Sequence, residues 1–380
     1  MGNCCKKKKT NELLSGLEKE ELITKTSSLS DIPQKPSVTS DDFELLKEIG
    51  RGSLGVILLV KYKHNNQLYA MKILSKSLIK EKGQEIHTQS ERDLMIQINC
   101  PFIVNIKFAF QNDTKLFLVQ EFVPGGDLYF HLQESGKFDN EKVKFYMIEL
   151  VLAIIFLHKK NMIYRDLKPE NILLDKNGHI KLTDFGISKL LLKPSEKAYT
   201  ICGTTSYLAP EIMEGKGYNK PVDWWSLGCV MFEMLTGRYP YKVPENNYGY
   251  FEPKVVFSKK IKFPKTFDDV TKDLILKLLE INPEKRIGDD NIQKHPYFSG
   301  INWKDAMNKK IKPPFIPELN DEMDLRYFDK TFTDEIVDEN KIGSYFNTNF
   351  GSNEYKDFSY VAGSSFSEAD MKELKEEEEV

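Results

Sequence analysis

Residues 164–171 (Tyr-Arg-Asp-Leu-Lys-Pro-Glu-Asn) place a carboxylate, a lysine and an amide in one short stretch, and Asp184 opens an Asp-Phe-Gly sequence soon afterwards. Asp166 could accept the proton of a hydroxyl group, while Asn171 and Asp184 carry the hard oxygen donors that Mg²⁺ prefers. Lys168 could neutralise charge on a moving phosphoryl group. Each residue alone is unremarkable, because Asp and Asn favour turns. The ordered set predicts phosphoryl transfer to a hydroxyl group, and therefore an enzyme.

A glycine-rich segment at residues 50–55 could bring backbone N–H groups close to phosphate oxygens. Its residues are Gly50, Arg51, Gly52, Ser53, Leu54 and Gly55. A dinucleotide-binding motif would need a helix directly afterwards and an acidic residue about 20 positions on. Here an apolar, strand-like run follows, and Lys72 stands where the acidic residue should be. The chain also lacks the Gly-Lys-Ser/Thr sequence of a P-loop, and a plain hairpin turn remains the alternative for this segment.

Lys72 lies among apolar, strand-like residues in the sequence Tyr-Ala-Met-Lys. An unpaired charge in such a place would be costly to bury. Glu91 is a natural partner, because the apolar residues that follow it have helical spacing. The pair could hold the α- and β-phosphates of a nucleotide, and a purely structural ion pair is the alternative.

The 380-residue chain is 40% hydrophobic and 29% charged, which is typical of a soluble globular protein. Its net charge of −3 argues against a nucleic-acid partner. The charges are unevenly distributed, with four lysines at residues 6–9 and four glutamates at residues 376–379. The simplest interpretation of both runs is a solvated tail. The cysteines show no zinc or disulfide spacing, and no apolar run approaches the ~20 residues of a membrane span. We therefore expect a reducing, cytoplasmic environment.

The pattern along the chain predicts a strand-rich lobe followed by a helix-rich lobe, an α+β fold. Strand-like runs occupy residues 56–60, 68–74, 103–110 and 116–122, and helical patterns follow near 140–157, 223–235 and 273–279. Asp139 is a candidate N-cap for the first of these helices. We expect a disordered leader at 1–42, an N-lobe at 43–120, a hinge at 121–127, a C-lobe at 128–298 and an extended tail at 299–380.

Residues 43–298 resemble the catalytic domain of eukaryotic protein kinases, because the motifs above occur in that family's order. Ala-Pro-Glu at 209–211 and Asp-Trp-Trp at 223–225 match later motifs of the family. The resemblance implies a bilobal kinase fold, ATP and Mg²⁺ as cofactors, and a pair between Glu211 and Arg286. It also implies catalytic roles for Lys72, Glu91, Asp166 and Lys168, and Mg²⁺ binding by Asn171 and Asp184.

Three further features resemble the AGC group, which includes cAMP-dependent kinase and protein kinase B. They are Tyr164 in place of the usual His, Cys-Gly-Thr at 202–204, and the carboxy-terminal tail. The form of the catalytic loop indicates specificity for Ser or Thr rather than Tyr. The expected function is ATP-dependent phosphorylation of Ser and Thr in protein substrates by a monomeric signalling kinase. A kinase-fold scaffold or pseudokinase that acts by binding is the alternative.

The resemblance also implies where the nucleotide base would bind. The backbone of Glu121 and Val123 would contact adenine, and Gln120 stands where the family has an apolar side chain. The side chains expected to line the pocket are Ile49, Ile57, Ala70, Leu173 and Thr183.

Substrate preference can be inferred in the same way. Asp127, Glu170 and Glu233 match positions at which basophilic AGC kinases select Arg upstream of the phosphoacceptor. We therefore expect a preference for Arg at the second and third upstream positions. Thr205-Ser206 departs from the Pro-Glu typical of the group, which removes one acidic contact.

Two phosphorylation sites are expected, the first dependent on an upstream activating kinase. Thr200 precedes Ile-Cys-Gly, and Arg165, His87 and Lys189 could together receive its phosphate. In the tail, residues 355–360 (Tyr-Lys-Asp-Phe-Ser-Tyr) resemble the hydrophobic motif of AGC kinases. Its aromatic residues would fold back onto the small lobe beside the helix that carries Glu91, and Ser359 is the second expected site. An unbound aromatic tail is the alternative.

The amino-terminal sequence predicts contact with a membrane. Gly2 is a candidate for myristoylation, and Cys4 and Cys5 are candidates for palmitoylation, although Lys6 departs from the usual Ser or Thr. Two lipid chains, or one chain with a basic patch, make a stable anchor. We expect association with the inner, anionic face of a membrane such as the plasma membrane; a disordered basic leader is the alternative.

Overall fold

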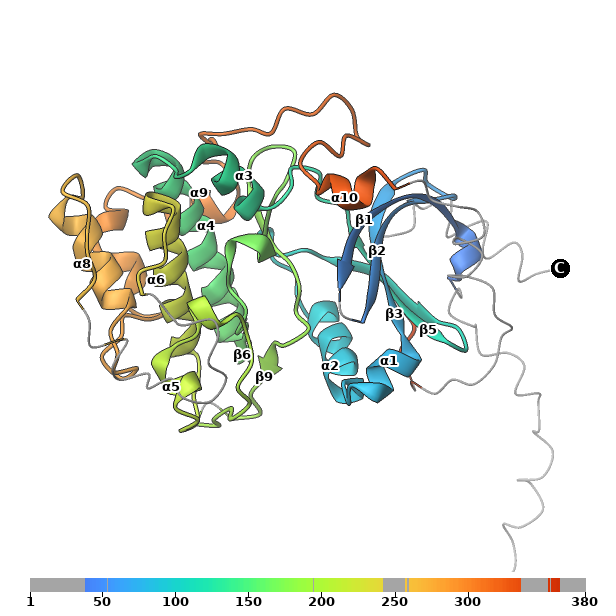
Figure 1. The fold of residues 1–380 in the computed structure, drawn as a ribbon, viewed down its shortest axis with the longest axis horizontal. Helices are drawn as coiled ribbons and strands as arrows, with labels where there is room; N and C mark the ends of the chain where they lie inside the picture. Colours follow the sequence, from blue (N-terminus) through green and yellow to red (C-terminus); the bar gives the residue numbers. More distant parts are fainter. Residues whose placement is uncertain are drawn as a thin grey trace, which may run out of the picture. The chain divides into compact units, whose positions relative to one another are not determined.

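An antiparallel sheet of six strands forms the smaller of two lobes, in the order β1-β2-β3-β5-β4-β10 (Figure 1). The strands are β1 (Phe43–Gly52), β2 (Gly55–Tyr62), β3 (Leu68–Ser75), β4 (Ile106–Gln111), β5 (Lys115–Glu121) and β10 (Tyr360–Val361). The computed structural model describes residues 38–52, 54–193, 195–241, 257, 260–335, 355 and 357–362, without the side chains of 86 and 87. Aromatic rings of Phe43, Tyr62 and Phe108 pack in this lobe with centroids 4.9 to 5.6 Å apart.

Two helices accompany this sheet, α1 (Lys76–Glu81) and α2 (Glu85–Ile96). The helical spacing predicted around Glu91 is confirmed by α2, whose Leu94 and Met95 are buried in the core. Because helical residues three and four apart share a face, Glu91 lies on the same buried side of α2. The helix thereby brings a carboxylate toward Lys72 on β3.

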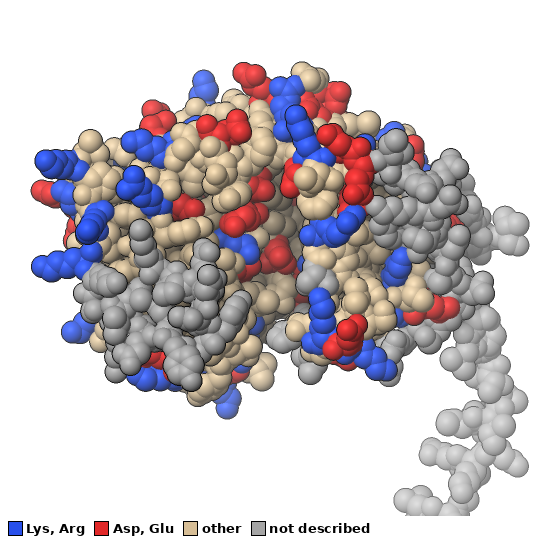
Figure 2. Space-filling model, in the orientation of Figure 1, with Lys and Arg blue, Asp and Glu red and all other residues tan. Residues whose placement is uncertain are grey.

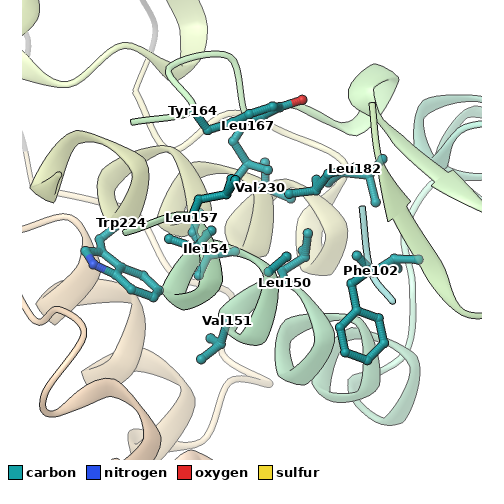
Figure 3. Close-up of a cluster of buried hydrophobic side chains, with 14 of the residues drawn as sticks. Phe102, Leu150, Val151, Ile154, Leu157, Tyr164, Leu167, Leu182, Trp224 and Val230 are labelled. Carbon is teal, nitrogen blue, oxygen red and sulfur yellow. The ribbon is translucent and has the colours of Figure 1, made fainter. Parts of the chain in front are cut away.

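Helices dominate the larger lobe, where α4 and α6 pack together, and Figure 3 shows buried hydrophobic side chains of both helices. They are α3 (Leu128–Ser135), α4 (Asn140–Lys159), α5 (Pro210–Met213), α6 (Pro221–Thr236), α8 (Asp269–Leu278) and α9 (Trp303–Met307). The predicted N-cap Asp139 is confirmed, since its carboxylate accepts a bond from the Lys142 N–H at 2.8 Å. Leu150, Ile154 and Val230 are fully buried, as expected for helices that are surrounded by other elements on nearly every side.

Short paired strands lie next to the two segments that carry the candidate catalytic residues. They are β6 (Met162–Ile163) with β9 (Lys189–Leu190), and β7 (Ile172–Leu174) with β8 (Ile180–Leu182). The stretch at 164–171 lies between β6 and β7, and Asp184 lies two residues after the end of β8. Single turns of 3-10 helix lie at Ser40–Asp42, Pro169–Asn171, Thr205–Tyr207, Ile292–Lys294 and Pro296–Phe298.

The larger lobe is braced by a buried ion pair that the sequence analysis expected. Arg286 donates to both carboxylate oxygens of Glu211, at 2.6 and 3.0 Å. The guanidinium carbon of Arg286 also lies 5.1 Å from the ring centre of Trp225. Such a two-point contact fixes orientation as well as distance, so it ties α5 to the segment after α8.

The tail is more structured than the extended form that the sequence analysis expected. It forms α9, then α10 (Lys330–Thr333), which packs beside β1 (Figure 1). Further on, Tyr360 and Val361 pair with Ala109 and Phe108, so the tail adds an edge strand to the small lobe. A strand of two residues is too short to be predicted from a sequence pattern, because its pairing depends on the docking of the tail onto the small lobe. No helix in the described part of the chain is long and apolar enough to cross a bilayer.

Candidate active site

Asp223 on α6 holds the backbone of the catalytic loop, residues 164–171. Its Oδ2 accepts the Tyr164 N–H at 2.9 Å, and its Oδ1 accepts the Arg165 N–H at 2.8 Å. Arg165 lies at φ = 72°, in the left-handed region that residues other than glycine rarely adopt. The two bonds to a buried carboxylate therefore stabilise a strained conformation immediately before Asp166.

The structure brings Asp166, Lys168 and Asn171 together at this loop. Asn171 Nδ2 donates to Asp166 Oδ2 at 3.0 Å and to its backbone oxygen at 2.8 Å. Lys168 Nζ lies 3.0 Å from the same carboxylate oxygen. Thr204 donates from Oγ1 to the other oxygen at 3.1 Å and accepts a bond from Lys168 at 2.9 Å. The sequence analysis singled out Cys-Gly-Thr at 202–204 but gave Thr204 no role, and the fold makes it the fourth member of this group.

Lys72 connects the small lobe to Asp184 of the large lobe. Its Nζ lies 2.7 Å from Glu91 Oε1 and 3.4 Å from Asp184 Oδ1. Burial alone would lower the pKa of Lys72, but the carboxylates of Asp184 and Glu91 raise it above its ordinary value. In turn, the charge of Lys72 lowers the pKa of Asp184. Both groups therefore stay ionised at neutral pH.

The backbone around Asp184 leaves little room for other residues. Asp184 itself lies at φ = 58°, and its Oδ1 accepts the Gly186 N–H at 3.3 Å. A Cβ at Gly186 would lie 3.3 Å from Asp184 Oδ1 and 3.5 Å from Glu91 Oε2, so glycine keeps the two carboxylates accessible. An ionised carboxylate at Asp184 and the amide of Asn171 form an oxygen donor set that fits Mg²⁺.

The glycine-rich segment forms the hairpin between β1 and β2, where Gly52 pairs with Gly55. A Cβ at Gly55 would lie 1.8 Å from the carbonyl oxygen of Ile73, so no side chain fits there. A Cβ at Gly52 would meet nothing within 4 Å, which leaves open space at the tip. Glycine at 55 therefore allows β2 to approach β3, and the open space at Gly52 fits the approach of a phosphate to the backbone. Ser53 lies outside the described residues.

Arg51 directs its side chain toward the tail. Its Nη2 lies 2.7 Å from Glu48 Oε1 and 3.6 Å from Glu335 Oε2. The ring of Phe332 lies 6.0 Å from its guanidinium carbon. Arg51 can therefore contribute to the nucleotide site only through its backbone, while Gly50 pairs with Ile57 on the neighbouring strand. Leu54 packs against the core.

Two of the residues expected at the adenine site lie where β3 meets β5. Ala70 pairs with Gln120 across the two strands, and Gln120 is buried with its Nε2 3.4 Å from Met95 Sδ. Glu121 has a role that the sequence analysis missed, since its carboxylate accepts the Asn105 N–H at 2.8 Å and lies 2.7 Å from Lys181 Nζ. Of the remaining expected residues, Ile49 and Val123 are buried, whereas Ile57, Leu173 and Thr183 are partly buried.

Asp127, Glu170 and Glu233 form an acidic cluster from three separate elements. Asp127 is the N-cap of α3, Glu170 lies in the 3-10 turn at the end of the catalytic loop, and Glu233 is on α6. Burial, with the charge of Glu170 as a further cause, raises the pKa of Asp127 to about 6 and that of Glu233 to about 7. Glu170 Oε2 is buried without a hydrogen-bond partner in the part of the chain that the structure describes. Acidic side chains line the hollow between the lobes (Figure 2).

Two of the groups expected to receive a phosphate on Thr200, Arg165 and Lys189, bond to other partners in this structure. Arg165 donates to the Ile187 carbonyl oxygen and, at 3.1 Å, to the Tyr218 hydroxyl. Lys189 lies 3.3 Å from Glu196, and the side chain of His87 lies outside the described residues. Thr200 is exposed, and its carbonyl oxygen accepts a bond from Tyr218 at 2.6 Å. Arg165 thus reaches the Thr200 backbone through one tyrosine rather than directly.

The hydrophobic motif docks on the small lobe beside α2, as the sequence analysis expected. Phe358 is fully buried, and Arg92 on α2 donates to its carbonyl oxygen at 3.1 Å and to that of Asp357 at 2.6 Å. Gln111 donates to the Tyr355 carbonyl oxygen at 2.7 Å. These contacts join the tail to the helix that carries Glu91. Ser359 is exposed, and Gly2, Cys4 and Cys5 lie outside the described residues.

Comparison with known proteins agrees with this geometry. The model of the family "Protein kinase domain" matches residues 43–298. The serine/threonine-protein kinase YPK1 of Saccharomyces cerevisiae is 45% identical over 320 residues, which are 81% of this chain and 47% of that protein. The RAC family serine/threonine-protein kinase homolog of Dictyostelium discoideum is 43% identical over 325 residues, 85% of this chain and 72% of that protein. The serine/threonine-protein kinase gad8 of Schizosaccharomyces pombe is 45% identical over 306 residues, covering 80% of this chain and 53% of that protein. The chain thus spans about half the length of the two yeast relatives.

Proposed function

Because this chain belongs to the protein kinase family and to its AGC group, we propose that it transfers the γ-phosphoryl group of ATP to Ser and Thr residues of proteins. The observation that carries the proposal is the convergence of Lys72, Asp166 and Asp184 between two lobes. Lys72 is charged and held by Glu91, while Asp166 is oriented by three neighbours. Such an arrangement supplies positioning and electrostatic stabilisation, which are what phosphoryl transfer requires.

Each residue has a role that its surroundings support. Asp166, fixed by Asn171 and Thr204, accepts the proton of the substrate hydroxyl group. Lys168 stabilises negative charge on the transferred group, and Lys72 binds the phosphates of the nucleotide. Asn171 and Asp184 would hold Mg²⁺, which supplies charge neutralisation on the phosphate oxygens when it is bound.

The alternative is a scaffold that keeps the kinase fold without the reaction, since fold alone does not fix activity. A protein that only binds would have no need to keep Lys72 and Asp184 ionised, or to hold Asp166 in contact with its three neighbours. The strained backbone at Arg165 and at Asp184 also favours catalysis, because strain persists where function requires it.

The acidic cluster supports a preference for upstream Arg. Its three carboxylates repel one another, which helps to raise the pKa of Asp127 and of Glu233. A guanidinium group would relieve this repulsion and satisfy Glu170 Oε2, which is buried without a partner among the described residues. Charged pairs at such sites contribute mainly to specificity.

Phosphorylation of Thr200 and Ser359 is the proposed route of activation. Both residues are exposed and accessible to another kinase. A phosphate on Thr200 would compete for Arg165, which lies next to the catalytic Asp166, and so would act on the loop directly. Ser359 follows Phe358, whose docking reaches α2 and therefore Glu91.

We further assign residues 1–42 to membrane targeting, 43–298 to catalysis and 299–380 to an AGC tail. Gly2, Cys4 and Cys5 would carry lipid, and the lysines at 6–9 would add about 1 kcal/mol each toward an anionic surface. Together these features would hold the enzyme at the inner face of a membrane.

The activity itself is tested with Asp184→Ala. We expect the wild-type protein to transfer ³²P from ATP to Ser/Thr peptides, and the variant to lose at least about a hundredfold in rate, since both a metal ligand and the Lys72 contact disappear. Asp269→Ala, at a fully exposed carboxylate, is the matched control. A wild-type protein without transfer, or a variant with equal transfer, would favour the scaffold.

Specificity is tested with Glu170→Gln and with pH. The variant should raise KM about tenfold for a peptide with Arg at the second and third upstream positions, and leave a peptide with Ala there unchanged. For the wild type, KM of the Arg peptide should fall as the pH rises through about 6 and about 7, because Asp127 and Glu233 then become anions. Glu141→Gln, at an exposed position on α4, is the control. Equal KM values for both peptides would rule out the preference.

Activation is tested with Thr200→Ala and Ser359→Ala in protein phosphorylated by cell extract. We expect Thr200→Ala to lose most of its turnover and Ser359→Ala to lose a smaller part, because Arg165 adjoins Asp166 whereas the tail acts through α2. Mass spectrometry of the wild type should find phosphate at both residues. Unchanged turnover in purified Thr200→Ala would contradict the proposal.

Membrane targeting is tested by fractionating cells that express Gly2→Ala. Loss of the myristoyl acceptor should move the protein from the membrane pellet to the supernatant, and Gly16→Ala should leave the distribution unchanged. Kinase activity of the variant should persist, because Gly2 is far along the sequence from the residues proposed to be catalytic. An unchanged membrane fraction in Gly2→Ala would refute lipid anchoring.

A further inference from the structure

His158 is fully buried at the end of α4 between two carboxylates from other parts of the chain. Its Nε2 lies 2.8 Å from Asp223 Oδ2, and its Nδ1 lies 2.7 Å from Asp289 Oδ1. The same Asp289 oxygen accepts a bond from Trp224 Nε1 at 2.8 Å, and the Trp224 ring meets the imidazole edge-on. Asp289, between α8 and the 3-10 turn Ile292–Lys294, thus closes a chain of polar contacts that leads inward to Asp223.

Two carboxylates at one imidazole require two ring protons. A neutral imidazole carries a single N–H, so one of the carboxylates would face a nitrogen lone pair. Burial alone would lower the pKa of His158, but the bonds to Asp223 and Asp289 raise it above its ordinary value. Burial alone would raise the pKa of Asp289, and the bond to His158 lowers it. The cation also lies in the last turn of α4, where the helix dipole favours positive charge.

The charged groups acting on this imidazole come from two directions. Asp223 on α6 and Asp289 act on His158 itself. Lys220, immediately before α6, acts on Asp289. Hydrogen bonds between charged partners are roughly twice as strong as neutral ones. Asp289 therefore strengthens the contact between His158 and Asp223 by keeping both ring nitrogens protonated.

Asp223 is the carboxylate that holds the N–H groups of Tyr164 and Arg165, one residue before Asp166. We propose that Asp289 is a positioning residue for phosphoryl transfer, acting through His158 and Asp223 to fix the backbone that orients Asp166. The inference rests on the proposed kinase activity. Asp289 lies outside every motif that predicted the site, and only the fold connects it to the catalytic loop through His158 and Asp223.

The test is Asp289→Asn in the full chain, with ATP and an Arg-containing peptide. Loss of one charge-assisted bond should lower kcat about tenfold while both KM values stay within about twofold, because no substrate contact changes. Asp289→Glu, which keeps the charge, should recover most of kcat. Asp290→Asn, at the exposed neighbouring position, should match the wild type. Should Asp289→Asn not fold, Asp289→Ser gives the same readouts.

A second readout separates positioning from simple loss of stability. Because a raised pKa keeps His158 charged until the pH rises through it, NMR of labelled His158 should show the wild-type ring deprotonating above 6.5, its ordinary pKa, and the Asp289→Asn ring at a lower pH. The loss of kcat at high pH should move with it. Equal kcat in Asp289→Asn and Asp290→Asn, or an unmoved His158 titration, would overturn the proposal. A wild-type protein without phosphotransfer would instead contradict the proposed function, and the NMR titration would then test only whether Asp289 keeps His158 charged.

Discussion

The buried carboxylate of Asp223 is the interaction on which the catalytic loop depends. It accepts two backbone N–H groups, at Tyr164 and at Arg165, and faces the imidazole of His158. Arg165 would not hold a positive φ without such bonds, because a side chain is strained there. Asp166 follows directly, so the position of the proposed base is set by α6 and α4 rather than by the loop itself.

A second constraint couples the lobes through charge. Lys72 comes from the sheet, Glu91 from α2 and Asp184 from the segment after β8, and the single ammonium group lies 2.7 Å from one carboxylate and 3.4 Å from the other. The tail docks Phe358 against the small lobe and binds Arg92 on α2. Whatever displaces that tail therefore acts on the helix that holds Lys72. The proposed regulation and the proposed catalysis would share helix α2, so the proposed phosphorylation of Ser359 would have a physical route to Lys72.

The acidic cluster of Asp127, Glu170 and Glu233 differs from these sites because its charges all have the same sign. Ion pairs stabilise the sites of Lys72 and Arg286. In the acidic cluster, burial and the charge of Glu170 raise the pKa of Asp127 and of Glu233, and Glu170 Oε2 has no hydrogen-bond partner among the described residues. A cluster of this kind costs stability in the free protein and regains it when a cation binds. That is the expected property of a surface that selects basic substrates.

Residue types and their order along the chain were enough to predict a protein kinase with a strand-rich and a helix-rich lobe. Lys72, Glu91, Asp166, Asn171 and Asp184 could be singled out because each lies in a short motif that can be read locally. The partners that join distant segments could not be predicted, such as Thr204 with Asp166, Asp289 with His158 and the tail strand β10 with β4. The fold also gives Arg165 and Lys189, two groups expected at the phosphate site, the partners Tyr218 and Glu196. These contacts depend on how buried polar groups find partners across the fold, which no local pattern encodes.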